Sequence, residues 1–431
     1  MSGSSLRSYR WGIAVAVAVL AGAVGAGCGS GGGGGSKQGV TKSSIVIGSH
    51  QPLTGPAAPG YSNISKGSTA YFDWVNAHGG VNGRKIKYKV EDDAYNPSQT
   101  TTKVRKLVLK DRVFALFDGL GTPTHLAVAK FLNQQKVPDL FVASGCNCWN
   151  DTGKLPQTSG WQTEYTIEGK ILGQYINQKF KGQKVGYFFQ NDEFGQDGVK
   201  GLDQQIPKSQ VVSRQHYTPT KTNVGAQIAA LQSKGAKVVG LYTIPAFTAL
   251  ALLDAAKIGY QPTWVVSSVG SDPVTLGGLL KTFSKGKAGS SLLEGMVSGA
   301  YESPVTDTSD PWIKLFKKIH DKYIPKVPFD GNVEYGMGVG YTFVDLLKKT
   351  GKNPTREKLL STLESGKLST GAGLVPFGYS KSSHLGYIGE QVVVNRGGKL
   401  QKQGKPLTTS NTGPIKPYTK SQSAPPPNGI P

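Results

Sequence analysis

The sequence has little of what most enzyme and metal sites require. It contains only three cysteines and six histidines in 431 residues. The histidines are scattered and no second cysteine pair completes a tetrahedral set, which argues against a metal site. We find no Walker A loop, Gly-x-Ser-x-Gly elbow, His-Glu-x-x-His pair or complete dinucleotide fingerprint, and Gly336-Met337-Gly338 falls inside an expected helix. We therefore expect no catalysis, no metal and no cofactor.

Acidic side chains are also scarce. There are 27 of them against 49 Lys and Arg, a formal net charge of +22. Such an excess can indicate nucleic-acid binding, but the lysines are spread along the whole chain without a dense basic block. A basic surface facing anionic lipids or envelope polymers is the simpler interpretation, and we expect no nucleic-acid partner.

The first residues have the pattern of an export signal. Arg7 and Arg10 precede an uncharged run from Trp11 to Gly27, and Cys28 follows. The residues before Cys28 resemble a bacterial lipobox, although Gly25 stands where an aliphatic residue is usual. We predict a signal peptide over 1–27 and lipidation at Cys28, on the outer face of the bacterial cytoplasmic membrane, with a Gly-rich linker over 28–43. An ordinary secretory signal with an incidental cysteine is the alternative.

The two remaining cysteines lie close together. Cys146 and Cys148 are separated by one residue. Export makes oxidation possible, yet the spacing is too short for an ordinary long-loop disulfide. A local disulfide and two free thiols both remain open.

From Ser44 onward, short apolar runs alternate with amphipathic helical stretches, and the series then repeats. Two successive βα series predict two doubly wound, mainly parallel sheets, each in its own lobe. Expected strands cover 45–49, 85–90, 113–119, 139–144, 184–190, 210–217, 237–243 and 263–268. Expected helices cover 64–77, 124–135, 193–205, 223–233, 246–258, 312–323, 333–349 and 355–364. A final strand pair is expected at 371–377 and 390–395, and the Pro- and Ser-rich residues 406–431 are expected to be disordered.

One strand-to-helix junction stands out as a candidate binding element. Phe117-Asp118-Gly119-Leu120-Gly121-Thr122-Pro123-Thr124 contains glycines that allow close backbone approach, with Thr122 suited to the N-cap. A helix N-terminus at the carboxyl end of a parallel strand can hold a carboxylate. The next strand end, Val142 to Cys146, would lie beside it.

At this point the chain resembles a known family. LTGPAAPG, a helix ending in NAHGGVNGRKI, the Asp92-Asp93 pair, DGLGTPT, VPDLFVASG and NDEFGQDG are similar, in order and separation, to the branched-chain amino acid (Leu/Ile/Val) type of periplasmic binding protein. The resemblance covers roughly Ser44 to Lys405. It implies an α/β, type 1 periplasmic binding protein fold whose two doubly wound lobes are joined by a three-strand hinge. It places lobe 1 at 44–162 with 299–370, and lobe 2 at 163–298 with 371–405.

The resemblance also implies ligand contacts. In the first lobe the candidates are Thr122, Thr124, Ser144 and Gly145. Across the cleft they are Phe194 and Tyr242, and we expect Tyr242→Ala to weaken affinity and leave the fold intact. Both rings could instead be core. Tyr61 and Tyr335 are further candidates for the cleft wall.

One position departs from the family pattern. Val269 stands where amino-acid binders place a Glu for the ligand ammonium, and a buried ammonium without a partner is costly. Either Asp272 or Asp192 substitutes for that Glu, or the ligand is not an α-amino acid.

Together these features predict an extracytoplasmic solute receptor of an ABC importer. Its expected partners are a small polar solute, a membrane permease and the membrane through the lipid anchor, and the receptor itself is expected to be a monomer. A sensor or adhesin with the same cleft is the competing function.

Overall fold

The computed structural model describes residues 37–431, and its first β-sheet is entirely parallel. The strand order is β2-β1-β3-β4-β5. The bounds are β1 Ser44–Gln51, β2 Lys85–Asp92, β3 Ala115–Phe117, β4 Asp139–Val142 and β5 Thr158–Gly160. Every residue of β3 and β4 is buried, as expected for central strands of a parallel sheet covered by helices.

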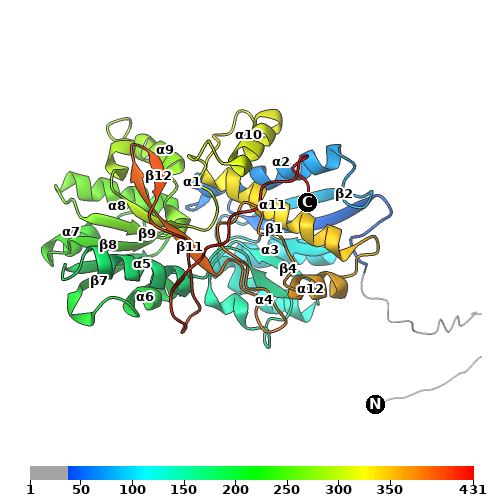
Figure 1. Cartoon of the computed structure of the whole chain (residues 1–431), viewed down its shortest axis with the longest axis horizontal. Helices are drawn as coiled ribbons and strands as arrows, with labels where there is room; N and C mark the ends of the chain where they lie inside the picture. The colour runs from blue at the N-terminus through cyan, green and yellow to red at the C-terminus, as the bar shows by residue number, and fades with distance from the viewer. Residues whose placement is uncertain (1–36) are drawn as a thin grey trace, which may run out of the picture. The chain divides into compact units, whose positions relative to one another are not determined.

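The second sheet is larger and mixed (Figure 1). Its order is β14-β13-β11-β10-β9-β8-β6-β7, with β12 paired to β11. Strands β6 to β10 pair in parallel, whereas β11 to β14 pair antiparallel. The bounds are β6 Val185–Gln190, β7 Val211–Tyr217, β8 Val238–Tyr242, β9 Thr263–Val266, β10 Val297–Ala300, β11 Gly389–Arg396, β12 Lys399–Lys402, β13 Leu407–Thr408 and β14 Lys416–Pro417. The two sheets define two α/β lobes, as predicted.

The helices divide between the sheets. Those of the first lobe are α1 Ala58–Tyr61, α2 Ile64–Ala77, α3 Pro97–Arg105, α4 Thr122–Gln134, α10 Pro311–Tyr323, α11 Gly331–Thr350 and α12 Arg356–Glu364. Those of the second are α5 Tyr165–Lys179, α6 Glu193–Asp203, α7 Gly225–Ser233, α8 Pro245–Lys257 and α9 Pro273–Phe283. The bounds agree with the expected helices to within a few residues.

Gly336 has a packing role. The long helix α11 lies against α2, and a Cβ at residue 336 would overlap the carbonyl oxygen of Ile64. A Cβ at Gly67 on α2 would likewise overlap the carbonyl oxygen of Val333. Gly67 and Gly336 therefore let the two helix backbones approach closely, which accounts for glycine at position 336 inside a helix.

Helix starts follow side-chain capping. Asp310 caps α10 by accepting hydrogen bonds from the backbone N–H groups of Trp312 and Ile313. Thr355 caps α12 by accepting the backbone N–H of Lys358. Gly121, rather than the expected Thr122, is the N-cap residue of α4, and its φ of 100° suits glycine.

The expected strand at 371–377 does not form. Residues there make only isolated bridges, Glu302 with Gly373 and Phe377 with Tyr387. The hydroxyl of Tyr379 donates to the carbonyl oxygen of Gly160 at 2.7 Å, so this segment packs beside the first lobe. Strand β11 instead pairs with β10. The run at 371–377 is apolar, as the sequence shows, but its backbone groups form hydrogen bonds with loops rather than with a sheet.

The C-terminal residues are ordered, contrary to the expectation of a disordered tail. Strand β13 pairs with β11, and further hydrogen bonds run from Lys170 Nζ to Gly413 O (2.6 Å), Trp312 Nε1 to Ser423 O (2.6 Å) and Tyr71 Oη to Gly429 O (2.8 Å). The segment has few apolar residues, but its carbonyl groups satisfy donors at the surface of the body. It therefore runs from the second lobe to the first.

The predicted signal peptide and Cys28 lie outside the described residues. Within residues 37–431, no helix combines the length and apolar character needed to cross a bilayer. Ordered structure begins before residue 43, the expected end of the linker, because Val40 already forms a β-bridge with Ile45.

Candidate functional site

The carboxyl ends of strands from both sheets border one cavity. Its volume is about 140 Å³, and its lining comes from both lobes and from the segments that connect them. Leu120 follows β3, Ala143 follows β4, Ile244 follows β8 and Ser268 follows β9. This is the edge at which doubly wound sheets bind ligands.

The wall from the first lobe is built at the start of α4. Gly121 and Thr122 line the cavity, and the Thr122 hydroxyl is 2.6 Å from the hydroxyl of Ser144. The first N–H groups of a helix lack intrahelical acceptors, and its N-terminus carries a partial positive charge. This wall can therefore receive an anionic or carbonyl oxygen.

The other predicted residues of this wall lie behind it. The Thr124 hydroxyl donates to the carbonyl oxygens of Leu120 and Gly121, at 2.5 and 3.1 Å, and Thr124 does not line the cavity. Ser144 supports Thr122 from behind. Gly145 is also outside the lining, where its carbonyl oxygen accepts a hydrogen bond from the Tyr165 N–H at 2.7 Å.

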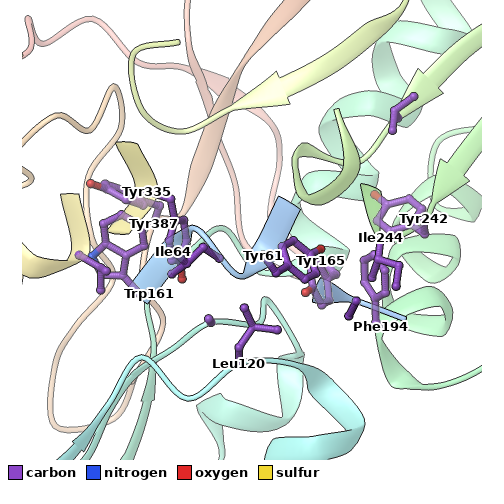
Figure 2. Close-up of a cluster of buried hydrophobic side chains, with 14 of the residues drawn as sticks. Tyr61, Ile64, Leu120, Trp161, Tyr165, Phe194, Tyr242, Ile244, Tyr335 and Tyr387 are labelled. Atoms are coloured by element: carbon purple, nitrogen blue, oxygen red, sulfur yellow. The ribbon is translucent and has the colours of Figure 1, made fainter. Parts of the chain in front are cut away.

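The wall from the second lobe includes Phe194 and Ile244. Phe194, at the start of α6, lines the cavity as predicted. Tyr242, the last residue of β8, is only 1% exposed and packs behind Phe194, with ring centroids 5.9 Å apart. Figure 2 shows Tyr242 beside Phe194 and Ile244. Strand β8 ends at Tyr242, inside the lobe, and Ile244, two residues later, is the residue that lines the cavity.

Tyrosines form most of the remaining aromatic wall. The two that the sequence suggested, Tyr61 and Tyr335, line the cavity, as do Tyr95, Tyr165 and Tyr301, which were missed. Tyr165 lies next to the first crossing between lobes, a position that could have marked it. Nothing in the local sequence distinguishes Tyr95. In Figure 2 Tyr61 and Tyr165 lie between Leu120 and the second-lobe cluster at Phe194.

The two aspartates proposed to replace the missing Glu act as helix caps. Asp272 lines the cavity beside Val269, but one oxygen accepts the backbone N–H of Thr275 at 2.7 Å. Burial raises the pKa of Asp272. Asp192 is outside the lining and caps α6, accepting the Phe194 N–H at 3.1 Å. Asp272 is near the cavity but already bonded, and Asp192 is not in it.

Two glutamates that sequence reasoning missed also line the cavity. Glu302 follows β10 at the second crossing between lobes, and Glu334 lies in the first turn of α11. They are 5% and 6% exposed. Burial, the largest cause in each case, raises the pKa of both carboxyls well above the usual range. Glu334 directly precedes Tyr335, which the sequence suggested as a cleft residue. That neighbour is the sequence signal that could have identified Glu334.

The cysteine turn lies beside the first-lobe wall. Cys146 and Cys148 are joined by a disulfide. Between them, the Asn147 N–H donates to a carboxylate oxygen of Asp197 on α6, at 2.9 Å. The disulfide therefore closes a turn that contacts the second lobe. Of the two alternatives that the sequence left open, a local disulfide and two free thiols, the structure has the disulfide.

Comparison with known proteins identifies the family. A family model described as "Periplasmic binding protein" matches residues 44–386, most of the chain. The chain belongs to this family. Among curated relatives, Leu/Ile/Val-binding protein homolog 3 of Brucella melitensis is 26% identical over 212 residues, which cover 46% of this chain and 54% of the relative. An amino acid binding protein of Pseudomonas aeruginosa is 25% identical over 209 residues, 46% and 53% of the two chains. These matches span about half the length of the relatives.

Solved structures show the same fold for this periplasmic binding protein. A branched-chain amino acid ABC transporter protein from Thermus thermophilus with bound valine aligns with a TM-score of 0.75 and 19% identity, covering 86% of this chain and 98% of the other. A fatty acid ABC transporter substrate-binding protein from Thermomonospora curvata aligns with a TM-score of 0.74 and 22% identity, covering 87% and 95%. The type 1 fold predicted from the sequence is confirmed. The two neighbours are named for different ligands, so the fold leaves the ligand class of this chain open.

Proposed function

We propose that this periplasmic binding protein is the extracytoplasmic receptor of an ABC importer, which closes on a small polar solute and does not transform it. The solute is an amino acid or a related carboxylate or amide, and the receptor acts as a monomer that delivers it to a membrane permease. The observation that carries the proposal is the cavity at the carboxyl ends of the strands, with walls from both lobes.

Contacts between the lobes support a closing mechanism. The Tyr61 hydroxyl of the first lobe donates to the carbonyl oxygen of Val269 at 3.4 Å. Gln190 of the second lobe donates through Nε2 to the hydroxyl of Tyr95 at 3.3 Å. A solute between such walls makes its full set of contacts only when the lobes are closed, so binding shifts the population toward closure.

The test is a thermal-shift screen of the mature protein against amino acids, amides, ureas, aromatic carboxylates and sugars, followed by uptake of the active solute in cells with and without the gene. A solute at about a hundred times its dissociation constant stabilises the protein by roughly 2.7 kcal/mol. Loss of uptake on deletion supports import. Binding with unchanged uptake indicates a sensor or adhesin, and turnover of the solute contradicts a receptor role.

The Thr122 hydroxyl is expected to contribute directly to binding. Thr122 lines the cavity, and Thr122→Val keeps the side-chain shape and removes the hydroxyl, so the variant should bind the solute about tenfold more weakly. Thr124→Val is the matched control, since Thr124 is outside the cavity lining and its hydroxyl bonds only the backbone carbonyls of Leu120 and Gly121. Calorimetric titration of both variants measures the difference. Equal affinity of the Thr122 variant and the wild type would remove Thr122 from the site.

Membrane attachment is proposed to occur through Cys28. Cys28→Ser removes the thiol that would carry the lipid, so the variant should move from the membrane fraction to the soluble extracytoplasmic fraction. Fractionation and immunoblotting compare it with the wild type. An unchanged membrane fraction would contradict lipidation at Cys28.

A further inference from the structure

Glu302 and Glu334 bring two carboxyl groups to the cavity from different parts of the chain. Glu302 lies in the crossing segment after β10, and Glu334 on the first turn of α11. Burial, and for Glu302 also the neighbouring charge of Glu334, raises the pKa of both carboxyls, so the pair holds protons more readily than exposed carboxyls do.

The pair lacks donors from the protein. Among the described residues, both oxygens of Glu302 and Oε1 of Glu334 accept no hydrogen bond from a donor group. The nearby Tyr387 hydroxyl donates instead to the carbonyl oxygen of Thr370 at 2.7 Å. Buried carboxylate oxygens normally have hydrogen-bonded or charged partners, so these face the cavity with unused acceptor capacity.

The residues that line the cavity around the pair favour a positively charged ligand. The cavity lining within residues 37–431 contains Asp272, Glu302 and Glu334 but no Lys, Arg or His, although the chain carries a net charge of +22. The rings of Tyr301 and Tyr335 also line it. Aromatic faces attract cations, and desolvated sites strengthen that attraction.

We propose that the Glu302–Glu334 pair is the cation subsite of the cleft, and that the solute carries a cationic nitrogen, such as a primary ammonium, bound between these two carboxyls. This inference rests on the proposed solute-binding function and specifies its ligand class. In this proposal the Glu302–Glu334 pair, rather than position 269, which is Val here, holds the nitrogen. A solute with a carboxylate as well can place it at the N-terminus of α4, near Thr122.

Binding of the ammonium changes the proton count of the pair. An ammonium that donates N–H bonds to both carboxyls stabilises their charged forms and lowers the pKa of each. Binding therefore releases to solvent the protons that the unliganded pair holds at that pH. Other titratable groups facing the pair are Asp310, Asp272 and the phenols of Tyr301 and Tyr387, none of which supplies a positive charge.

Matched probes test the subsite. Leucine, 3-methylbutylamine and 4-methylpentanoate share a side chain and differ in whether they carry the ammonium, the carboxylate or both. Phenylalanine, phenethylamine and 3-phenylpropanoate form a second such set. We expect thermal shifts from members with a nitrogen and none from the carboxylate-only members. Titration calorimetry at neutral pH, in buffers of different ionisation enthalpy, should show that binding of these probes releases protons.

Variants test the residues themselves. Glu302→Gln and Glu334→Gln should each weaken binding of the nitrogen-bearing probes roughly tenfold to a hundredfold and abolish proton release. Both should melt at or above the wild-type temperature, because a costly buried carboxyl is removed. Glu390→Gln is the matched control, a buried carboxyl outside the cavity lining. It should leave affinity and proton release unchanged.

The outcomes are distinguishable. Equal binding of carboxylate-only probes, or variants of Glu302 and Glu334 that bind like the wild type, would overturn the cation subsite while leaving the receptor function intact. Solutes found in the wider screen that all lack a cationic nitrogen would overturn it in the same way. If no solute of any class shifts the melting temperature, the proposed function fails and the subsite with it.

Discussion

Replacing His125 by leucine is expected to lower the free energy of unfolding by about 3–5 kcal/mol, because it breaks a buried chain of ionisable groups. His125 Nε2 lies 2.8 Å from a carboxylate oxygen of Asp139, and its Nδ1 lies 2.9 Å from His50 Nε2. His50 Nδ1 in turn lies 2.8 Å from a carboxylate oxygen of Asp93. All four side chains are buried.

Proton counting shows why the chain depends on both imidazoles. Each aspartate needs an N–H from its histidine, which places one proton on His50 Nδ1 and one on His125 Nε2. Leucine at 125 removes the donor to Asp139 and the partner of His50, and leaves Asp139 with only the Thr158 hydroxyl at 2.9 Å.

Chemical denaturation measures this effect, with His216→Leu as the control. His216 lies on β7 with an exposed side chain, where substitutions usually change stability by less than about 0.5 kcal/mol. A loss for His125→Leu no larger than that of the control would show that the chain adds little to stability. The double variant with His50→Leu should lose less than the sum of the two single losses, since both break the same contact.

The fold could be predicted because its signals are local. Buried parallel strands are short apolar runs, and the runs at 45–49, 85–90 and 139–144 became β1, β2 and β4. Caps such as Asp310 follow from adjacent residues. The segment at 371–377 shows the limit of this method, since apolar character alone does not say whether a sheet edge is available for pairing.

The site was harder to predict because it depends on long-range placement. The histidines are scattered along the sequence, yet His50 and His125 meet because β1 ends and α4 begins at the same edge of the first sheet. Glu302 and Glu334 meet across a crossing segment and a helix. Thr122 and Phe194 were predicted by resemblance and line the cavity, whereas Thr124 and Tyr242 fall just behind it.

Tyr242→Ala is expected to destabilise the protein by about 3–5 kcal/mol, rather than leave the fold intact as the sequence suggested. The ring is 1% exposed, and a Cβ at Gly198 on α6 would overlap it. Glycine at 198 has no side chain to refill the space, so alanine leaves a cavity beside the helix backbone. Thermal and chemical denaturation measure the loss.

Tyr242→Phe separates the two roles of this side chain. It keeps the ring that packs on α6 and Phe194 and removes only the hydroxyl, which lies in the interior near Glu168. We expect its stability to stay within about 1 kcal/mol of the wild type, with unchanged solute affinity, because the residue does not line the cavity. A stable Tyr242→Ala protein with weakened binding would instead place Tyr242 in contact with the solute, and would mean that the chain reaches the cleft two residues before Ile244.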